Sequence, residues 1–291
     1  MKVSYYPGCS LESTGKSYDH SAREVCGALG VELQEVSDWV CCGSSAGLKM
    51  NKFVSTALSG VNLALLEKQE AAEVVAPCPF CYRRLASAQE EMRQDPKLKG
   101  EVQEAIEAEL KGDLKIHNLV GFLREKVGLG AIAAKLKKPL AGLKVVPYYG
   151  CFMVKPQQVT ACDDPENPTS MDEILRALGA EVLNWDFKTE CCGAGLSLSK
   201  TDKVVELTGR IVREAAFRGA DAIVVACQLC QANLDMRQAK VGQEDAKQYD
   251  LPVIYFTQLM GLAFGIAPEA LGLNHHLVDP IALLQKKGLI G

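Results

Sequence analysis

The chain has 291 residues, 48% of them hydrophobic and 23% charged, which is typical of a soluble globular protein with one large or two ordinary domains. Acidic residues outnumber basic ones by 36 to 32 and no run of lysine or arginine occurs, so we exclude nucleic acid as a partner. The most apolar stretch, 253–267, contains a glutamine and is shorter than the ~20 residues of a membrane helix, so we expect no membrane insertion. The first residues lack the apolar core of a secretory signal, and we therefore expect a cytoplasmic protein.

The first half of the sequence predicts alternating strands and helices. Short β-type runs predict strands at 2–6, 31–36 and 72–76, and apolar residues at helical spacing predict helices at 17–29 and 53–68. Two charged stretches with a helical period follow, at 88–111 and 119–127. Glycine, lysine and proline then cluster between residues 128 and 143, which indicates a domain boundary.

The pattern starts again after this boundary. Leu143 to Cys151 repeats the character of the opening segment from Lys2 to Cys9. Strands are predicted next at 180–183 and 221–225, and helices at 171–178 and 202–218. We therefore predict an α/β fold of two related tandem domains, 1–140 and 141–291, each with a small, mainly parallel sheet flanked by helices. The two domains should be related by a pseudo-twofold axis.

Ten of the 12 cysteines follow one arrangement that occurs twice. In the first copy, 31 residues separate the first cysteine from an adjacent pair, 35 separate this pair from the next cysteine, and two separate the last two. In the second copy the numbers are 39, 34 and two. Each group follows a predicted strand, where open α/β folds place their sites. The ten residues are Cys9, Cys41, Cys42, Cys78 and Cys81, and then Cys151, Cys191, Cys192, Cys227 and Cys230.

A metal is the better explanation of these thiols than disulfides. A reducing cytosol disfavours disulfides, and adjacent cysteines have diverging side chains that rarely bridge. Four thiolates complete a tetrahedral zinc site, so five in each copy are one too many for zinc. Adjacent cysteines suit a multinuclear iron–sulfur centre better, although a structural zinc or simply buried thiols stay open as alternatives.

The two copies, with Cys41-Cys42-Gly43 and Cys191-Cys192-Gly193, resemble the cysteine-rich CCG domains of the heterodisulfide reductase B-type subunits, and the bacterial members most. The resemblance covers the chain from end to end and includes the segments 163–172 and 230–238. One departure is Gln228, which stands where the first copy has Pro79. The other is Cys162, which precedes an acidic pair.

The resemblance implies two noncubane [4Fe-4S] clusters, one held by the five cysteines of each copy. It also implies a reaction in which a small-molecule disulfide is reduced or formed between the two clusters. Electrons would arrive from a heterodisulfide reductase C-type iron–sulfur subunit, and an A-type subunit would complete the complex. The ligands implied for the first cluster are Cys9, Cys41, Cys42, Cys78 and Cys81, and for the second Cys151, Cys191, Cys192, Cys227 and Cys230.

Two other functions stay open at this point. The chain could be the CCG electron-transfer subunit of a lactate- or glycolate-oxidising complex, although the segment 163–172 argues against it. It could also be a structural protein that holds zinc and presents a binding surface. Outside the motif, Cys26 is expected in the core and Cys162 as a free loop thiol. Lys155, Lys188 and Glu190 are weak candidates for a proton donor.

Overall fold

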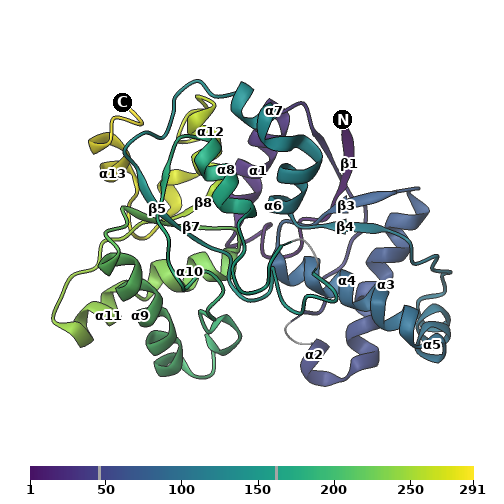
Figure 1. Cartoon of the computed structure of the whole chain (residues 1–291). Helices are drawn as coiled ribbons and strands as arrows, with labels where there is room; N and C mark the ends of the chain where they lie inside the picture. Colours follow the sequence, from purple (N-terminus) through teal and green to yellow (C-terminus); the bar gives the residue numbers. More distant parts are fainter. Residues whose placement is uncertain (45–46, 161–162) are drawn as a thin grey trace.

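The computed structural model describes residues 1–44, 47–160 and 163–291. It contains two four-stranded sheets, one in each half of the chain, which lie side by side in Figure 1. Their strand orders are β2-β1-β3-β4 and β6-β5-β7-β8, and every pairing is parallel. The first sheet consists of β1 (Lys2–Tyr5), β2 (Glu32–Glu35), β3 (Glu73–Val75) and β4 (Lys115–His117). The second consists of β5 (Lys144–Tyr148), β6 (Glu181–Val182), β7 (Ala222–Val225) and β8 (Val253–Tyr255).

The central strands are apolar because helices cover both faces of a parallel sheet. All four residues of β7 are buried, and so are the last four of β5. The register is equivalent in the two halves: Tyr5 pairs with Val75, and Pro147 pairs with Val224. The carboxyl ends of the strands in each sheet therefore meet at one edge, as the predicted α/β fold requires.

Helices flank both sheets, with α3 to α5 beside the first and α9 to α11 beside the second (Figure 1). The helices of the first half are α1 (Lys16–Ala28), α2 (Gly47–Met50), α3 (Lys52–Lys68), α4 (Pro79–Gln94), α5 (Pro96–Ile106), α6 (Leu119–Phe122), the π-helical segment η1 (Leu123–Gly128) and α7 (Leu129–Ala134). Those of the second half are α8 (Ser170–Ala177), η2 (Ala194–Leu196), α9 (Thr201–Phe217), α10 (Gln228–Met236), α11 (Gln238–Asp245), α12 (Phe256–Ala263), η3 (Leu273–His275) and α13 (Ile281–Lys286). Within the described parts of the chain, no helix has the length and apolar character needed to cross a bilayer.

Three local predictions differ from the structure. The sequence analysis missed the short outer strands β4 and β8, whose neighbours in the sequence have a helical pattern. It treated 88–111 as one charged helical stretch, whereas α4 begins at Pro79 and α5 at Pro96. A proline fits the first turn of a helix but not its interior, so Pro96 separates the two. The expected boundary segment also contains α7, and Lys137 and Lys138 donate backbone hydrogen bonds to Ala263. The division at residue 140 stays a prediction.

The two halves are joined by an apolar contact between α1 and the segment formed by β8 and α12. The rings of Tyr18 and Tyr255 stack with their centroids 4.7 Å apart and their planes 3° apart. Beside them, the hydroxyls of Ser21 and Thr257 lie 2.7 Å apart in a buried hydrogen bond. Stacked aromatic rings bury a large apolar area with defined geometry, so this contact fixes how the halves face each other.

Candidate metal centre

The first set of cysteines lies in loops beyond the carboxyl ends of β1, β2 and β3. The sulfur of Cys9 lies 3.8 Å from that of Cys41, and the sulfur of Cys42 lies 3.5 Å from that of Cys81. Cys78 caps the amino end of α4 and shares a hydrogen bond with Cys81 in the first turn of this helix. Three distant segments of the chain thus bring the five thiols of the first set together.

The second set repeats this arrangement around β5, β6 and β7. The sulfur of Cys192 lies 3.6 Å from that of Cys230, and Cys227 caps α10 as Cys78 caps α4. All five thiols of the second set line one small cavity, and Pro79 and Phe80 of the first half complete its wall. The fold therefore gathers all ten cysteines that the sequence singled out.

Two equivalent glycines allow the backbone to pass close to these thiols. Gly8 and Gly150 have φ angles of +75° and +68°, a conformation that side chains other than glycine rarely adopt. A Cβ atom at Gly8 would lie 2.5 Å from the sulfur of Cys81. At Gly150 it would lie 3.0 Å from the sulfur of Cys230. Both residues leave room for the sulfur of a motif cysteine.

Two equivalent tyrosines fasten the loops that carry the adjacent cysteines. The hydroxyl of Tyr6 donates to the carbonyl of Val40 at 2.6 Å, directly before Cys41. The hydroxyl of Tyr148 donates to the carbonyl of Glu190 at 2.6 Å, directly before Cys191. Both phenol rings are buried, so burial keeps their pKa values high and the hydroxyls protonated as donors. Each tyrosine ties the end of a central strand to a cysteine pair.

The electrostatic surroundings favour thiolates at several of these positions. The hydrogen bond that Cys42 shares with Cys41, followed by the one with Cys81, holds the pKa of Cys42 below its ordinary value. In the second set, the hydrogen bond with Cys151 lowers the pKa of Cys191 to about 6. Because thiolate is the form that binds iron or zinc, both sets are prepared to bind a metal.

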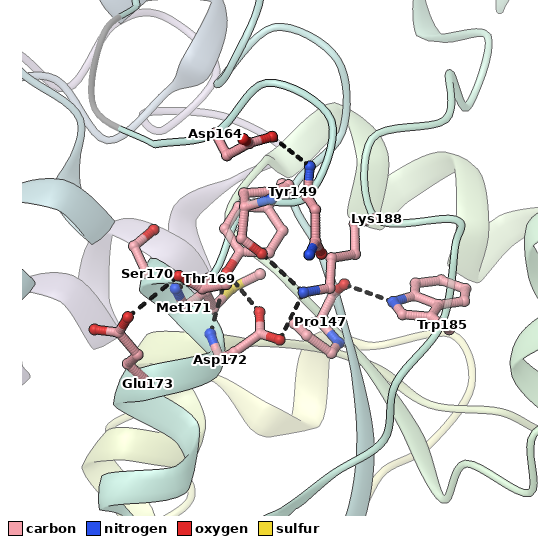
Figure 2. A network of polar contacts seen from close by, with 12 residues as sticks. Pro147, Tyr149, Asp164, Thr169, Ser170, Met171, Asp172, Glu173, Trp185 and Lys188 are labelled. Carbon is pink, nitrogen blue, oxygen red and sulfur yellow. Dashed lines mark hydrogen bonds and ion pairs between the residues drawn. The ribbon is translucent and has the colours of Figure 1, made fainter.

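The second set has a buried polar network behind it, which Figure 2 shows. The hydroxyl of Tyr149 donates to the Asp172 carboxylate at 2.6 Å, and the Lys188 ammonium donates to the same carboxylate at 2.8 Å. Lys188 also donates to the carbonyl of Pro168 at 2.8 Å, and its own carbonyl accepts from the backbone amides of Tyr149 and Gly150. The network therefore joins the segment before α8 to the residues immediately before Cys151.

The loop before α8 is held by its own acidic side chains. The Asp163 carboxylate accepts from the backbone amides of Thr169 and Ser170, at 3.0 Å and 2.8 Å for Oδ2. The Asp164 carboxylate accepts from the amides of Glu166 and Asn167, at 2.8 Å and 2.7 Å. Backbone hydrogen bonds of this kind lower the pKa of Asp164, beginning with the bond from Asn167. The loop is an ordered part of the second site.

Of the three candidate proton donors, Lys188 is fully committed to structure because its ammonium is buried against Asp172. Lys155 pairs with Glu166 at 2.9 Å on the surface, and the backbone of Glu190 serves the Tyr148 hydrogen bond. Cys26 lies in the core as predicted, and burial raises its pKa to about 12. Cys162 lies outside the described residues.

Sequence reasoning missed the residues that connect the two sets. The rings of Phe80 and Phe152 stack across the halves with centroids 4.0 Å apart, and each ring is close in sequence to a motif cysteine. The half-buried guanidinium of Arg83 lies 4.3 Å above Phe152, and no carboxylate of the described chain pairs with it. Gln228 reaches from the second half to Cys78 of the first. Only Gln228 had a signal in the sequence, because it breaks the repeat.

The donor sets fit iron–sulfur clusters. Each offers five soft sulfur ligands, with the pKa lowered at the second cysteine of each adjacent pair, Cys42 and Cys192, and with the last pair at a helix amino end, where negative charge is stabilised. The hydroxyl of Tyr18 is buried without a hydrogen-bond partner among the described residues, and it lies within electrostatic range of Cys227 and Cys78. A buried hydroxyl without a partner so close to the cysteines is expected where a sulfur-rich group is to be bound.

Three comparisons with known proteins agree with this geometry. A family model described as a cysteine-rich domain, CCG, matches residues 3–86 and 145–235. The chain is 30% identical over 285 residues to the 8-methylmenaquinol:fumarate reductase membrane anchor subunit of Wolinella succinogenes, covering 97% of this chain and 99% of the relative. It is 29% identical to the B subunit of the ferredoxin:CoB-CoM heterodisulfide reductase of Methanosarcina mazei, covering 98% and 96%. A crystal structure of a hypothetical protein from Helicobacter pylori shares the fold, with a TM-score of 0.77, 14% identity, and coverage of 96% of this chain but 52% of that protein.

Proposed function

Because this chain belongs to the cysteine-rich CCG domain family and is similar to a heterodisulfide reductase B subunit along almost its whole length, we propose that it reduces or forms a small-molecule disulfide within a redox complex. Each five-cysteine set binds one noncubane [4Fe-4S] cluster, with the ligands given above. Bound there, the two clusters would supply the two electrons that cleavage of an S–S bond requires, and two protons would complete the two thiols.

The observation that carries this proposal is the shared cavity of the second set. Its wall combines all five cysteines of one half with Pro79 and Phe80 of the other, so the thiols lie where the two halves meet. A protein that only stored metal would not need its two sites at a common boundary. The stacked rings of Phe80 and Phe152 line this cavity, and the Arg83 guanidinium places a positive charge near Cys151.

A structural zinc is less well supported. The sulfur atoms of Cys9 and Cys41, of Cys42 and Cys81, and of Cys192 and Cys230 lie 3.5 to 3.8 Å apart. A tetrahedral zinc ion takes four ligands, so the five thiols of each set suit a multinuclear cluster better than a single ion.

We propose that electrons come from a heterodisulfide reductase C-type iron–sulfur subunit and that an A-type subunit belongs to the same complex. We propose the cytoplasm as the place of the reaction, because its reducing conditions keep cysteines available as metal ligands.

Metal analysis of anaerobically purified protein tests the cofactor. We expect about eight iron and eight sulfide per chain for two clusters, whereas one or two zinc ions and no iron would contradict the proposal. The activity is tested by the disulfide-dependent oxidation of dithionite-reduced protein, with and without a C-type subunit, and by assay of the thiols formed. Cys26→Ala is the matched control, since Cys26 is a buried cysteine outside both sets.

A second candidate is an electron-transfer subunit that never binds a disulfide. The relative from Wolinella succinogenes favours it, because that protein is named as a subunit of an 8-methylmenaquinol:fumarate reductase. In this case the reduced clusters pass electrons to a partner, and no thiol forms with any disulfide. Iron-loaded protein that produces no thiol with a range of disulfides would support this candidate over the first.

A further inference from the structure

The two Cys-x-x-Cys pairs differ at the residue after the first cysteine. Cys78 is followed by Pro79 and Cys227 by Gln228, and both residues take the first position of a helix. Each of them faces the opposite half of the molecule. Pro79 lines the cavity of the second set, and Gln228 reaches Cys78 of the first set. The position at which the two Cys-x-x-Cys pairs differ is thus the position through which each half contacts the thiols of the other half.

Gln228 is well placed as a hydrogen-bond donor. Its side chain is buried, with 3% of its surface exposed, and its Nε2 atom lies 2.9 Å from the sulfur of Cys78. A ligand thiolate has no proton to donate, so the approach is favourable only when the amide presents its NH2 group. The Oε1 atom has no partner among the described residues, and it therefore does not compete for the orientation of the amide.

The stem of this side chain is held by Gly15 of the first half. A Cβ atom at Gly15 would lie 3.0 Å from the Cβ of Gln228 and 3.2 Å from its Cγ. The glycine therefore gives the stem a close-fitting place just before α1. Packing against one half and hydrogen bonding to a cysteine of that same half act together on Gln228.

A hydrogen bond to a ligand sulfur withdraws negative charge from it and favours the reduced state of the cluster, so it raises the reduction potential. The bond to Cys78 is strong in this respect, because Cys78 is buried and little water screens it. Pro79, in the equivalent place, has no donor to offer Cys227.

A second difference between the two sets also raises the reduction potential expected for the first cluster. Arg84 is buried within electrostatic range of Cys42, although Glu91 offsets part of its charge through an ion pair of 2.6 Å. The equivalent residue of the second half is the neutral Asn233, which donates to the backbone carbonyl of Cys192 at 3.1 Å and lies 3.8 Å from its sulfur. The first set thus has both the extra amide donor and the nearby cation.

We propose that Gln228 makes the first cluster the easier of the two to reduce, by donating a hydrogen bond across the boundary of the halves to the Cys78 ligand. This inference rests on the proposed function only in that both sets hold iron–sulfur clusters. With both clusters bound, an electron on the second would pass to the first, one being oxidised as the other is reduced, with no bond formed or broken. The asymmetry gives the two clusters a defined order of reduction.

The test is a redox titration of the intact chain with dithionite, followed by electron paramagnetic resonance. Gln228→Leu removes the donor and keeps most of the volume. We expect the oxidised-to-reduced ratio of the first cluster at a fixed potential to rise about tenfold, which is ~59 mV toward more negative values for a one-electron couple. The signal of the second cluster and the iron content should not change. Cys42→Ser and Cys192→Ser identify which signal belongs to which set.

Gly15→Ala gives an independent variant, because it displaces the stem of Gln228 from the other half and leaves the amide in the chain. We expect a shift of the same sign and smaller size. If Gln228→Leu does not fold, Gly15→Ala and the closer substitute Gln228→Met still decide the matter. An unchanged potential of the first cluster in the folded variants, or equal shifts of both clusters, would overturn the inference. Wild-type protein without iron would instead overturn the proposed function.

Discussion

The two cysteine sets share the same spacing of cysteines but differ in the polar side chains that support them. Behind the first set, Tyr5 donates to Asp19 at 2.6 Å, and Asp19 pairs with Arg23, whose side chain is partly exposed. Behind the second set, the pair of Asp172 and Lys188 is almost entirely removed from water. The strand ends, the glycines and the tyrosine contacts are alike in both. The comparison teaches that the duplicated frame holds the thiols, and that its two copies have since acquired different surroundings.

The largest expected effect separates the two sets. Cys42→Ser should abolish one cluster and remove about four of eight iron atoms, and Cys192→Ser should remove the other four, because each cysteine belongs to one set. Iron, sulfide and the paramagnetic signals of each variant measure this. Cys26→Ala should retain all iron. Loss of both clusters from either single variant would show that the sets are not independent.

A large effect on stability is expected only in the second half. Lys188→Met leaves the buried Asp172 carboxylate with the Tyr149 hydroxyl and the more distant, exposed Arg176 guanidinium at 3.7 Å, and loss of the close cation costs about 3 kcal/mol of the free energy of unfolding. Chemical denaturation measures this cost. Lys155→Met is the matched control, since its ion pair with Glu166 is exposed and should contribute at most ~1 kcal/mol. Equal losses in the two variants would show that the buried network contributes no more to the free energy of unfolding than the exposed ion pair does.

A smaller contrast concerns the glycines. Gly8→Ala places a methyl group 2.5 Å from the sulfur of Cys81, whereas Gly150→Ala places one 3.0 Å from the sulfur of Cys230. Both alter a backbone with positive φ, so the difference between the variants reports the clash with sulfur. We expect lower iron occupancy in both, with the greater loss from Gly8→Ala. Iron content per folded chain is the measurement, and the reverse order would contradict the geometry.

The smallest expected effect concerns the midpoint potentials of the two clusters, and it tests the difference between the two sets most directly. Exchanging the two divergent residues, by Pro79→Gln together with Gln228→Pro, should move the amide donor from the first set to the second. Both positions begin a helix, where proline is tolerated. We expect the order of the two midpoint potentials to reverse while the iron content stays the same. Potentials that keep their order would indicate that Arg84, and not Gln228, causes the asymmetry.

Much of this molecule could be predicted from its sequence. The repeated cysteine spacing and the alternation of short apolar runs with amphipathic segments predicted the α/β fold of two related halves. The CCG family follows from the same residues. Periodicity did not predict β4 and β8, because β4 lies between segments with a helical pattern and β8 runs directly into the apolar helix α12. The contacts of Phe80 with Phe152 and of Gln228 with Cys78 depend on how the halves face each other, which no local pattern encodes.

The contact between Gln228 and Cys78 also has a consequence for the order of events during synthesis. The two residues are separated by 150 positions in the chain, and translation proceeds from the amino end. The first five thiols therefore leave the ribosome long before the amide that completes their surroundings exists. Any iron–sulfur group delivered to them at that stage would meet an unfinished pocket, so the first site reaches its final chemical character only after the second half has been synthesised.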